Sequence, residues 1–277
     1  MFKHARNGTI TLGDTEMHYI SFGTGEHALI ILPGLGDGLT TVKGLALPLA
    51  MEYQAYARGT KTCDDSLQKA YTVFIFSRKN RLPEGYTTRD MAADQARAMR
   101  LLGITNANVM GVSQGGMIAQ YLAIDHPDLV KKLVLAVTCS RTSPQMEAVV
   151  KNWIRLAESD NYKALMIDTA EHSYSERYLK RYRPLYPLMG RIGKPKDFSR
   201  FMIQANACLQ HNAWPELNQI KCPVLILGGD TDRIVGVHSS RELYEQITGS
   251  ELYIYTGLGH AAYEEAKDFP ARVLAFL

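Results

Sequence analysis

One serine in this sequence stands in a setting that could support nucleophilic catalysis. Ser113 is the central residue of "GVSQG" (111–115), which fits the pattern G-x-S-x-G. Such a short pattern arises by chance in roughly one chain in ten of this length. Its meaning therefore depends on the segments on either side and on the presence of partner residues.

The segments around Ser113 have the composition of a strand followed by a helix. "NANVMGV" (106–112) is a β-rich apolar run, and "QGGMIAQYLAID" (114–125) has a helical pattern. A sharp strand-to-helix turn would project the serine hydroxyl above a sheet, near the positive end of the helix, and the glycines would leave room for the turn. This context predicts a nucleophile, whereas the alternative is a small residue at a tight turn.

A serine hydroxyl needs a base and a carboxylate that orients the base. Asp230 and Asp232 follow the apolar run "PVLILGG" (223–229), and His260 lies in a glycine-rich loop after "ELYIYT" (251–256). All three residues therefore follow predicted strands, as Ser113 does, and either aspartate could be the orienting acid.

The elements that would position these residues alternate along the chain. This alternation predicts an α/β fold with a mostly parallel sheet covered on both faces by helices. "TITLGDTEMHYISF" (9–22) predicts an antiparallel hairpin at the start. Residues 57–70 are expected to form a surface loop. Thr88 is the expected cap of its helix. The expected strands are 27–32, 71–76, 106–112, 131–137, 223–229 and 251–256, and the expected helices are 87–102, 114–125, 238–248 and 262–277.

The alternation stops after the sixth strand. Residues 141–214 have helical patterns without strands. We expect a helical cap there, inserted between two parts of one core, residues 1–140 and 215–277.

These segments resemble the α/β-hydrolase fold superfamily, and in particular its serine esterases, enol-lactonases and C–C hydrolases. The resemblance covers all but the cap and is carried by "LIILPGLGDG", "VMGVSQGGMIAQYLAIDHPDLVKKLVLAVT", "PVLILGGDTDRIV" and the histidine loop. It implies a triad in the chain order Ser113, Asp232, His260, because similar proteins place the acid before an x-[IV]-[VP] pair. Asp230 is then a turn or cap residue.

The resemblance also implies an oxyanion hole made of backbone N–H groups. The donors would be Gln114, directly after the nucleophile, and Leu35 in "ILPGLGDG". Pro33 stands where similar hydrolases carry a histidine, which puts the packing of this loop in question. In "FSRKN", Ser77 and Asn80 stand where many relatives have the aspartate and glycine of Asp-x-Arg-Gly.

Positive charge is concentrated in one part of the expected cap. Residues 177–200 carry eight basic residues and one acidic residue, Asp197, although the whole chain has a net charge of only +3. Such a segment could attract an anionic substrate or an acidic carrier protein. The alternative is a solvated lid surface. The candidate substrate-binding residues are Arg181, Arg183, Tyr178 and Tyr182.

Composition excludes several other classes. The weak net charge gives no argument for nucleic acid, and no segment reaches the roughly 18 apolar residues that a membrane span needs. Cys63, Cys139, Cys208 and Cys222 form no C-x-x-C pair, so we expect no metal site, no disulfide framework and no cofactor. The absence of a signal-peptide pattern predicts a cytoplasmic protein, and the oligomeric state stays open.

The sequence thus predicts a serine hydrolase that cleaves carboxylic esters of small molecules. A lactonase, thioesterase, C–C hydrolase or acyltransferase would keep the same triad. A ligand-binding receptor with slow or absent turnover is the alternative from another class.

Overall fold

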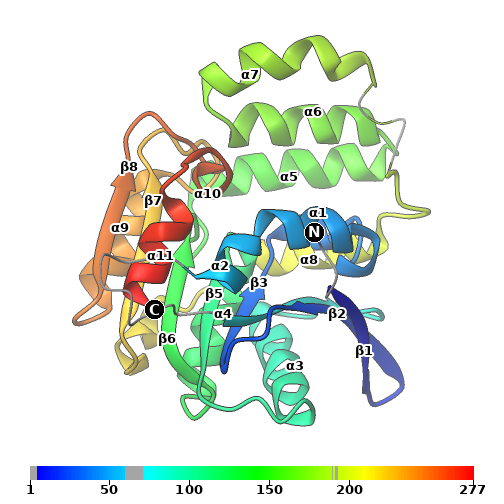
Figure 1. The fold of residues 1–277 in the computed structure, drawn as a ribbon. Helices are drawn as coiled ribbons and strands as arrows, with labels where there is room; N and C mark the ends of the chain where they lie inside the picture. Colours follow the sequence, from blue (N-terminus) through cyan, green and yellow to red (C-terminus); the bar gives the residue numbers. More distant parts are fainter. Residues whose placement is uncertain (1–4, 60–70, 189, 191–192) are drawn as a thin grey trace.

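The strands form one mostly parallel sheet. The computed structural model describes residues 5–59, 71–188, 190 and 193–277. In these residues eight strands lie in the order β1-β2-β4-β3-β5-β6-β7-β8, with β1 and β2 antiparallel and β3 to β8 parallel (Figure 1). The strands are Arg6–Leu12, Thr15–Phe22, His27–Leu32, Tyr71–Lys79, Ala107–Val112, Val130–Ala136, Val224–Gly229 and Glu251–Tyr255. The expected strands and opening hairpin are confirmed.

The central strands are apolar throughout because helices cover both of their faces. Along β3, Ile30 and Leu32 pack on one side, whereas Leu29 and Ile31 pack on the other. The first face is covered by α3 (Thr88–Leu101), α4 (Gln114–Asp125) and α9 (Val237–Gln246). The second face is covered by α1 (Ala46–Glu52), α2 (Gln54–Arg58) and α11 (Phe269–Phe276). Continuous apolar runs are what a parallel sheet between two helical layers requires.

Two sequence predictions about helix ends were wrong. Thr87, not Thr88, caps α3: its hydroxyl accepts the N–H of Asp90, and the Asp90 carboxylate accepts the N–H of Thr87. Thr88 is buried, and its hydroxyl is hydrogen-bonded to His211. This reciprocal capping box satisfies two N–H groups that the helix leaves unpaired.

The expected helix 262–277 is instead two helices, α10 (Ala262–Glu265) and α11. Pro270 lies in the first turn of α11, where its fixed φ and missing N–H are tolerated, but it cannot continue a helix from α10. Of the expected loop 57–70, Ala57 and Arg58 end α2, and residues 60–70 lie outside the described residues.

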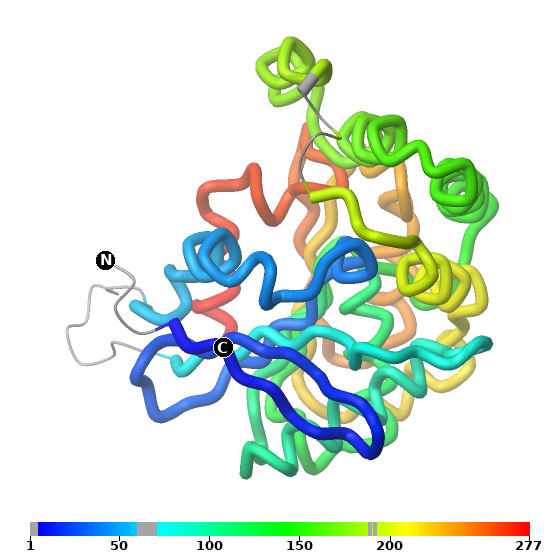
Figure 2. The backbone as a smooth tube through the Cα atoms, turned by 90° about the vertical axis from the view of Figure 1, so that its right-hand side faces the viewer, coloured from blue at the N-terminus to red at the C-terminus, as the bar shows by residue number. Residues whose placement is uncertain are grey.

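Helices without strands follow β6, as expected for the cap. They are α5 (Pro144–Glu158), α6 (Tyr162–Ser173), α7 (Glu176–Tyr182), the 3-10 helix η3 (Arg183–Leu188) and α8 (Ser199–Leu209). In both Figure 1 and Figure 2, α7 is the outermost of these helices. The α8 helix instead packs on the core, since a Cβ added to Gly38 would lie 2.8 Å from Phe201 Cα. The division of the chain at residues 141 and 214 stays a prediction.

Among the described helices, none combines the length and the apolar character that a membrane crossing requires. The described cysteines, Cys139, Cys208 and Cys222, carry free thiols, and Cys63 lies outside the described residues. Nor do the described ranges contain a group of three or more His, Cys, Asp or Glu side chains arranged to hold a metal ion.

Candidate active site

The turn between β5 and α4 holds Ser113 in a strained backbone conformation. Its φ of 54° and ψ of −120° are rare for a residue with a side chain, and such a conformation costs on the order of 1–3 kcal/mol. The turn is possible because the neighbours are glycines. A Cβ at Gly115 would lie 1.8 Å from the carbonyl oxygen of Leu32, and one at Gly111 would lie 2.4 Å from that of Gly115.

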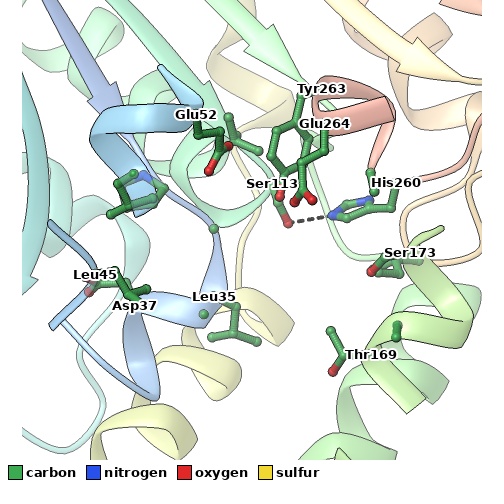
Figure 3. A pocket seen from close by; sticks show the side chains of 18 of the residues that line it. Leu35, Asp37, Leu45, Glu52, Ser113, Thr169, Ser173, His260, Tyr263 and Glu264 are labelled. Carbon is green, nitrogen blue, oxygen red and sulfur yellow. Dashed lines mark hydrogen bonds between the residues drawn. The ribbon is translucent and has the colours of Figure 1, made fainter. Parts of the chain in front are cut away.

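The structure brings Ser113, His260 and Asp232 into one hydrogen-bonded chain. Nε2 of His260 lies 2.9 Å from Ser113 Oγ (Figure 3), and Nδ1 lies 2.8 Å from Asp232 Oδ2. The other carboxylate oxygen of Asp232 accepts the N–H groups of Ile234 and Val235 at 2.8 and 3.0 Å. This geometry suits transfer of the serine proton to the imidazole.

The surroundings of Asp232 favour its ionised form. Burial alone would raise the pKa of this carboxyl group, but His260 and the two backbone N–H groups outweigh burial and hold the pKa below its usual range. An ionised Asp232 accepts a hydrogen bond from Nδ1–H of His260, so we assign Nε2 as the acceptor of the hydrogen bond from the Ser113 hydroxyl.

Asp230 lies outside this chain of contacts. Its Oδ1 accepts the N–H of Gly257 at 2.7 Å, which fastens the loop after β8 to the end of β7. This is the turn role that the sequence indicated. His211 is buried beside Thr88, and burial lowers its pKa to about 3, so this imidazole stays neutral in the core.

The two expected oxyanion donors each begin a helix. Leu35 is the first residue of the 3-10 helix η1 (Leu35–Gly38), and Gln114 is the first residue of α4. Backbone N–H groups at these positions have no partner within their helices. Gly34, next to Leu35, lies against Ser113, since a Cβ there would be 3.4 Å from the serine Cβ. The oxyanion role of the two N–H groups stays a prediction.

A buried arginine supports the loop at Pro33. One guanidinium nitrogen of Arg78 donates to the carbonyl oxygen of Pro33 at 2.6 Å and to Oε1 of Gln114 at 3.0 Å. Burial lowers the pKa of Arg78 to about 10, against the opposing effect of Asp37, so the group stays charged at neutral pH. The guanidinium therefore ties the loop at Pro33 to the residue after the candidate nucleophile.

Asp37 joins the same loop to α8. Its carboxylate accepts the Ser77 hydroxyl at 2.6 Å, the N–H of Arg78 at 3.0 Å and a guanidinium N–H of Arg200 at 2.7 Å. Arg200 also donates to the backbone oxygens of Asp37 and Arg78. Burial would raise the pKa of Asp37, but Arg200, Arg78 and the two hydrogen bonds hold it below its usual range.

Sequence reasoning missed this buried network. The only signal was Ser77, which stands where relatives carry an aspartate; Asp37 in the glycine loop was not singled out. The structure joins them, because Ser77 donates to the carboxylate of Asp37. The carboxylate beside the Ser77 loop is therefore that of Asp37, which belongs to the glycine loop after β3.

A cavity of about 400 Å³ opens onto Ser113 and His260. Figure 3 shows Glu52, Tyr263 and Glu264 on one side of Ser113 and Leu35 and Thr169 on the other. The cap contributes side chains from α5 and α6 to its wall: Trp153, Met166, Thr169, Ala170 and Ser173. A ligand in this cavity would contact both the core and the cap.

Comparison with known proteins agrees with this architecture. The family model described as "alpha/beta hydrolase fold" matches residues 64–267. The chain belongs to the α/β-hydrolase fold family. An enol-lactonase from Burkholderia xenovorans superimposes with a TM-score of 0.79, at 22% identity, over 97% of this chain and 99% of the other. At that identity the likeness shows a shared fold.

Two relatives with assigned names match this hydrolase over different shares of its sequence. A 2-hydroxy-6-oxononadienedioate/2-hydroxy-6-oxononatrienedioate hydrolase of Burkholderia vietnamiensis is 25% identical over 95% of this chain and 91% of its own. A putative carbamate hydrolase of a Caulobacter species is 29% identical over 71% of this chain and 74% of its own. These names describe hydrolases of different bonds, so they support a hydrolase without selecting a substrate.

The four residues expected to bind substrate from the cap do not line this hydrolase's cavity. These residues belong to α7 and the start of η3, whereas α5 and α6 supply the cap side of the wall; the four are Arg181, Arg183, Tyr178 and Tyr182. Arg183 is paired with Glu171 and Glu176, and the ring of Tyr178 stacks on Tyr174 and Tyr182. Arg183 is therefore not the unpaired cation that the expectation required.

Replacing Asp232 with asparagine tests the assignment of the acid. Asp232→Asn should lower kcat roughly 10³- to 10⁴-fold, because the neutral amide no longer holds His260 in the required tautomer or stabilises its charged form. Asp230→Asn is the matched control, and it should retain most of the activity. Ester hydrolysis and circular dichroism would be measured for both variants. Equal losses in the two variants would contradict the assignment.

The network around Asp37 should make stability depend on pH. Its pKa in the folded protein is below the ordinary value of 3.8, so the stabilisation is present above about pH 4 and is lost as the pH falls through the folded value. Asp37→Asn should therefore lower the free energy of unfolding by about 3 kcal/mol at pH 7, and by less at pH 3.

Urea unfolding at the two pH values measures this difference. Asp128→Asn is the control, since Asp128 forms an exposed ion pair with Arg100, and it should change stability little at either pH. An effect of Asp37→Asn that is the same at pH 7 and pH 3 would show that its charge does not support the fold.

Proposed function

We propose that this hydrolase cleaves carboxylic esters of small molecules through an acyl-enzyme on Ser113. The observation that carries the proposal is the hydrogen-bonded chain from Asp232 through His260 to Ser113, which opens into a cavity. A buried carboxylate, an imidazole and a hydroxyl in this order form the arrangement that activates a serine nucleophile.

In the proposed reaction, Ser113 Oγ attacks the ester carbonyl while Nε2 of His260 takes the hydroxyl proton. Asp232 stabilises the resulting imidazolium, and the N–H groups of Leu35 and Gln114 stabilise the negative charge on the carbonyl oxygen. The C–O bond then breaks, and the alcohol leaves with the proton from His260. A water molecule, deprotonated by His260, hydrolyses the acyl-enzyme and releases the acid.

A C–C hydrolase is the second candidate, because the named Burkholderia vietnamiensis relative matches nearly the whole chain. The name of that relative specifies a substrate with two carboxylates. The described lining of the cavity contains no lysine or arginine to pair with them, and it contains Glu52 and Glu264. This charge pattern favours esters without negative charge over a dianionic substrate, since like charges repel.

Ser113→Ala tests the proposed mechanism. The variant should lose labelling by a fluorophosphonate and at least about 10⁴-fold of the esterase kcat, because no other group takes the place of the nucleophile. The wild type and the variant would be compared on a panel of neutral p-nitrophenyl esters of different acyl length. A wild-type protein that is neither labelled nor active would favour a ligand-binding receptor on this fold.

A further inference from the structure

The wall of the cavity carries negative charge that no described cation neutralises. Three carboxylates line it, those of Asp37, Glu52 and Glu264, and the described lining includes no lysine or arginine. Asp37 is paired with Arg200. No described lysine or arginine forms an ion pair with Glu52 or Glu264. Apart from the candidate triad, the unpaired charge of the cavity is therefore acidic.

Glu52 and Glu264 come from different elements and influence each other. Glu52 ends α1, and Glu264 lies in α10, four residues after His260. Partial desolvation in the cavity and the charge of Glu264 raise the pKa of Glu52 to about 7, so this carboxyl group is partly protonated at neutral pH and ionises fully when a cation lies beside it. Both side chains remain accessible to solvent, so a ligand can reach them.

Tyrosine side chains surround the two carboxylates. Tyr53, Tyr174 and Tyr263 line the same cavity, and the Tyr174 hydroxyl donates to Glu264 Oε2 at 2.6 Å. Figure 3 shows the ring of Tyr263 beside Glu264 and close to Ser113. Aromatic rings attract cations through their negative faces, and the carboxylates add a direct electrostatic attraction.

The opposite part of the cavity has a different character. Leu35 lies there beside Thr169 in Figure 3, and it packs in one apolar cluster with Trp153 and Met166, which also line the cavity. A substrate whose ester group lies at Ser113 would thus meet an acidic, aromatic region in one direction and an apolar region in the other. The two regions distinguish a charged group from an uncharged chain on the same molecule.

We propose that the substrates of this hydrolase are esters that carry an alkylammonium group, bound among Glu52, Glu264 and the neighbouring tyrosines. This proposal rests on the proposed esterase function and specifies its substrate class. The ammonium group would relieve the repulsion between the two carboxylates, whereas an anionic substrate would increase it.

A metal ion is a poorer occupant of this region. Ca²⁺ takes six to eight oxygen ligands, and the described residues add no third acidic, histidine or cysteine side chain in a suitable arrangement. An alkylammonium group instead uses both the charge and the aromatic surface.

Matched ester pairs test the proposal, because a quaternary nitrogen and a quaternary carbon give groups of nearly the same size. On the acyl side, the pair is p-nitrophenyl 4-(trimethylammonio)butanoate and p-nitrophenyl 5,5-dimethylhexanoate. On the alcohol side, the pair is 2-(trimethylammonio)ethyl acetate and 3,3-dimethylbutyl acetate. In at least one pair, kcat/KM should be about tenfold higher for the cationic ester.

The double variant Glu52→Gln/Glu264→Gln should reduce this ratio to near one, because it removes both charges and preserves side-chain size. Glu245→Gln is the matched control: Glu245 is exposed on α9 outside the cavity, and this variant should keep the wild-type ratio. A wild-type ratio of one or less in both pairs, or a ratio that the double variant leaves unchanged, would overturn the proposal.

Protection of Ser113 from fluorophosphonate labelling gives a second measurement that needs no turnover. Butyltrimethylammonium should slow labelling of the wild type more than neutral 2,2-dimethylhexane does, and this difference should disappear in the double variant. Equal effects of the two compounds on the wild type would contradict the cationic site. Wild-type protein that is labelled and hydrolyses only the neutral esters would support the esterase function and contradict only the alkylammonium substrate class. Absence of both labelling and hydrolysis would contradict the esterase function and the substrate class together.

Discussion

The strained turn at Ser113 is the constraint on which the rest of the site depends. A side chain at φ 54° is unfavourable, so the surrounding structure must hold it in place. The serine N–H donates to Ala136 on β6, and its carbonyl oxygen accepts the Thr138 hydroxyl and the N–H of Gly116. The turn is therefore fixed by the neighbouring strand and by the start of α4. The turn lies at the carboxyl end of β5. Asp232 and His260 follow the carboxyl ends of the parallel strands β7 and β8, at the same edge of the sheet.

The loop that begins at Pro33 lies close to this turn, and two arginines hold it there, Arg78 fully buried and Arg200 partly buried. Arg78 joins the loop to the turn, because it donates to the carbonyl oxygen of Pro33 and to the side chain of Gln114. Arg200 reaches Asp37 from α8 and so connects the loop to a helix beyond the core strands. Burying these charges is costly unless they are paired, and the carboxylate of Asp37 supplies the opposite charge for both. Loss of one partner would leave the others buried and uncompensated.

The sequence predicted the elements that depend on local patterns. Buried parallel strands have continuously apolar sequences, and β3, β5 and β7 lie at the apolar segments of the sequence. The contact of Ser113 with His260 and of His260 with Asp232 could be expected, because all three residues stand directly after strands. The capping of α3 by Thr87 was missed, since Thr87 and Thr88 are chemically equivalent choices and the reciprocal bond with Asp90 decides between them.

Features that depend on long-range contacts could not be predicted in this way. Asp37 and Arg200 are far apart in the chain, and no periodic pattern connects an aspartate in a glycine loop with an arginine of the cap. The location of Glu52 in the cavity depends on how α1 packs over the sheet. Its neighbour Glu264 depends on the short α10, which a continuous helix over 262–277 would have placed differently.

The separation between α7 and the cavity shows why a local charge count does not give the field at a site. α7 lies outside α6, and a helix with its side chains is roughly 10 Å across, comparable to the distance of about 10 Å over which salt screens exposed charges. Arg183 is further neutralised by Glu171 and Glu176. The carboxylates of Glu52 and Glu264, in contrast, line the cavity itself. A chain with a positive net charge therefore presents a negative surface to the ligand that reaches Ser113.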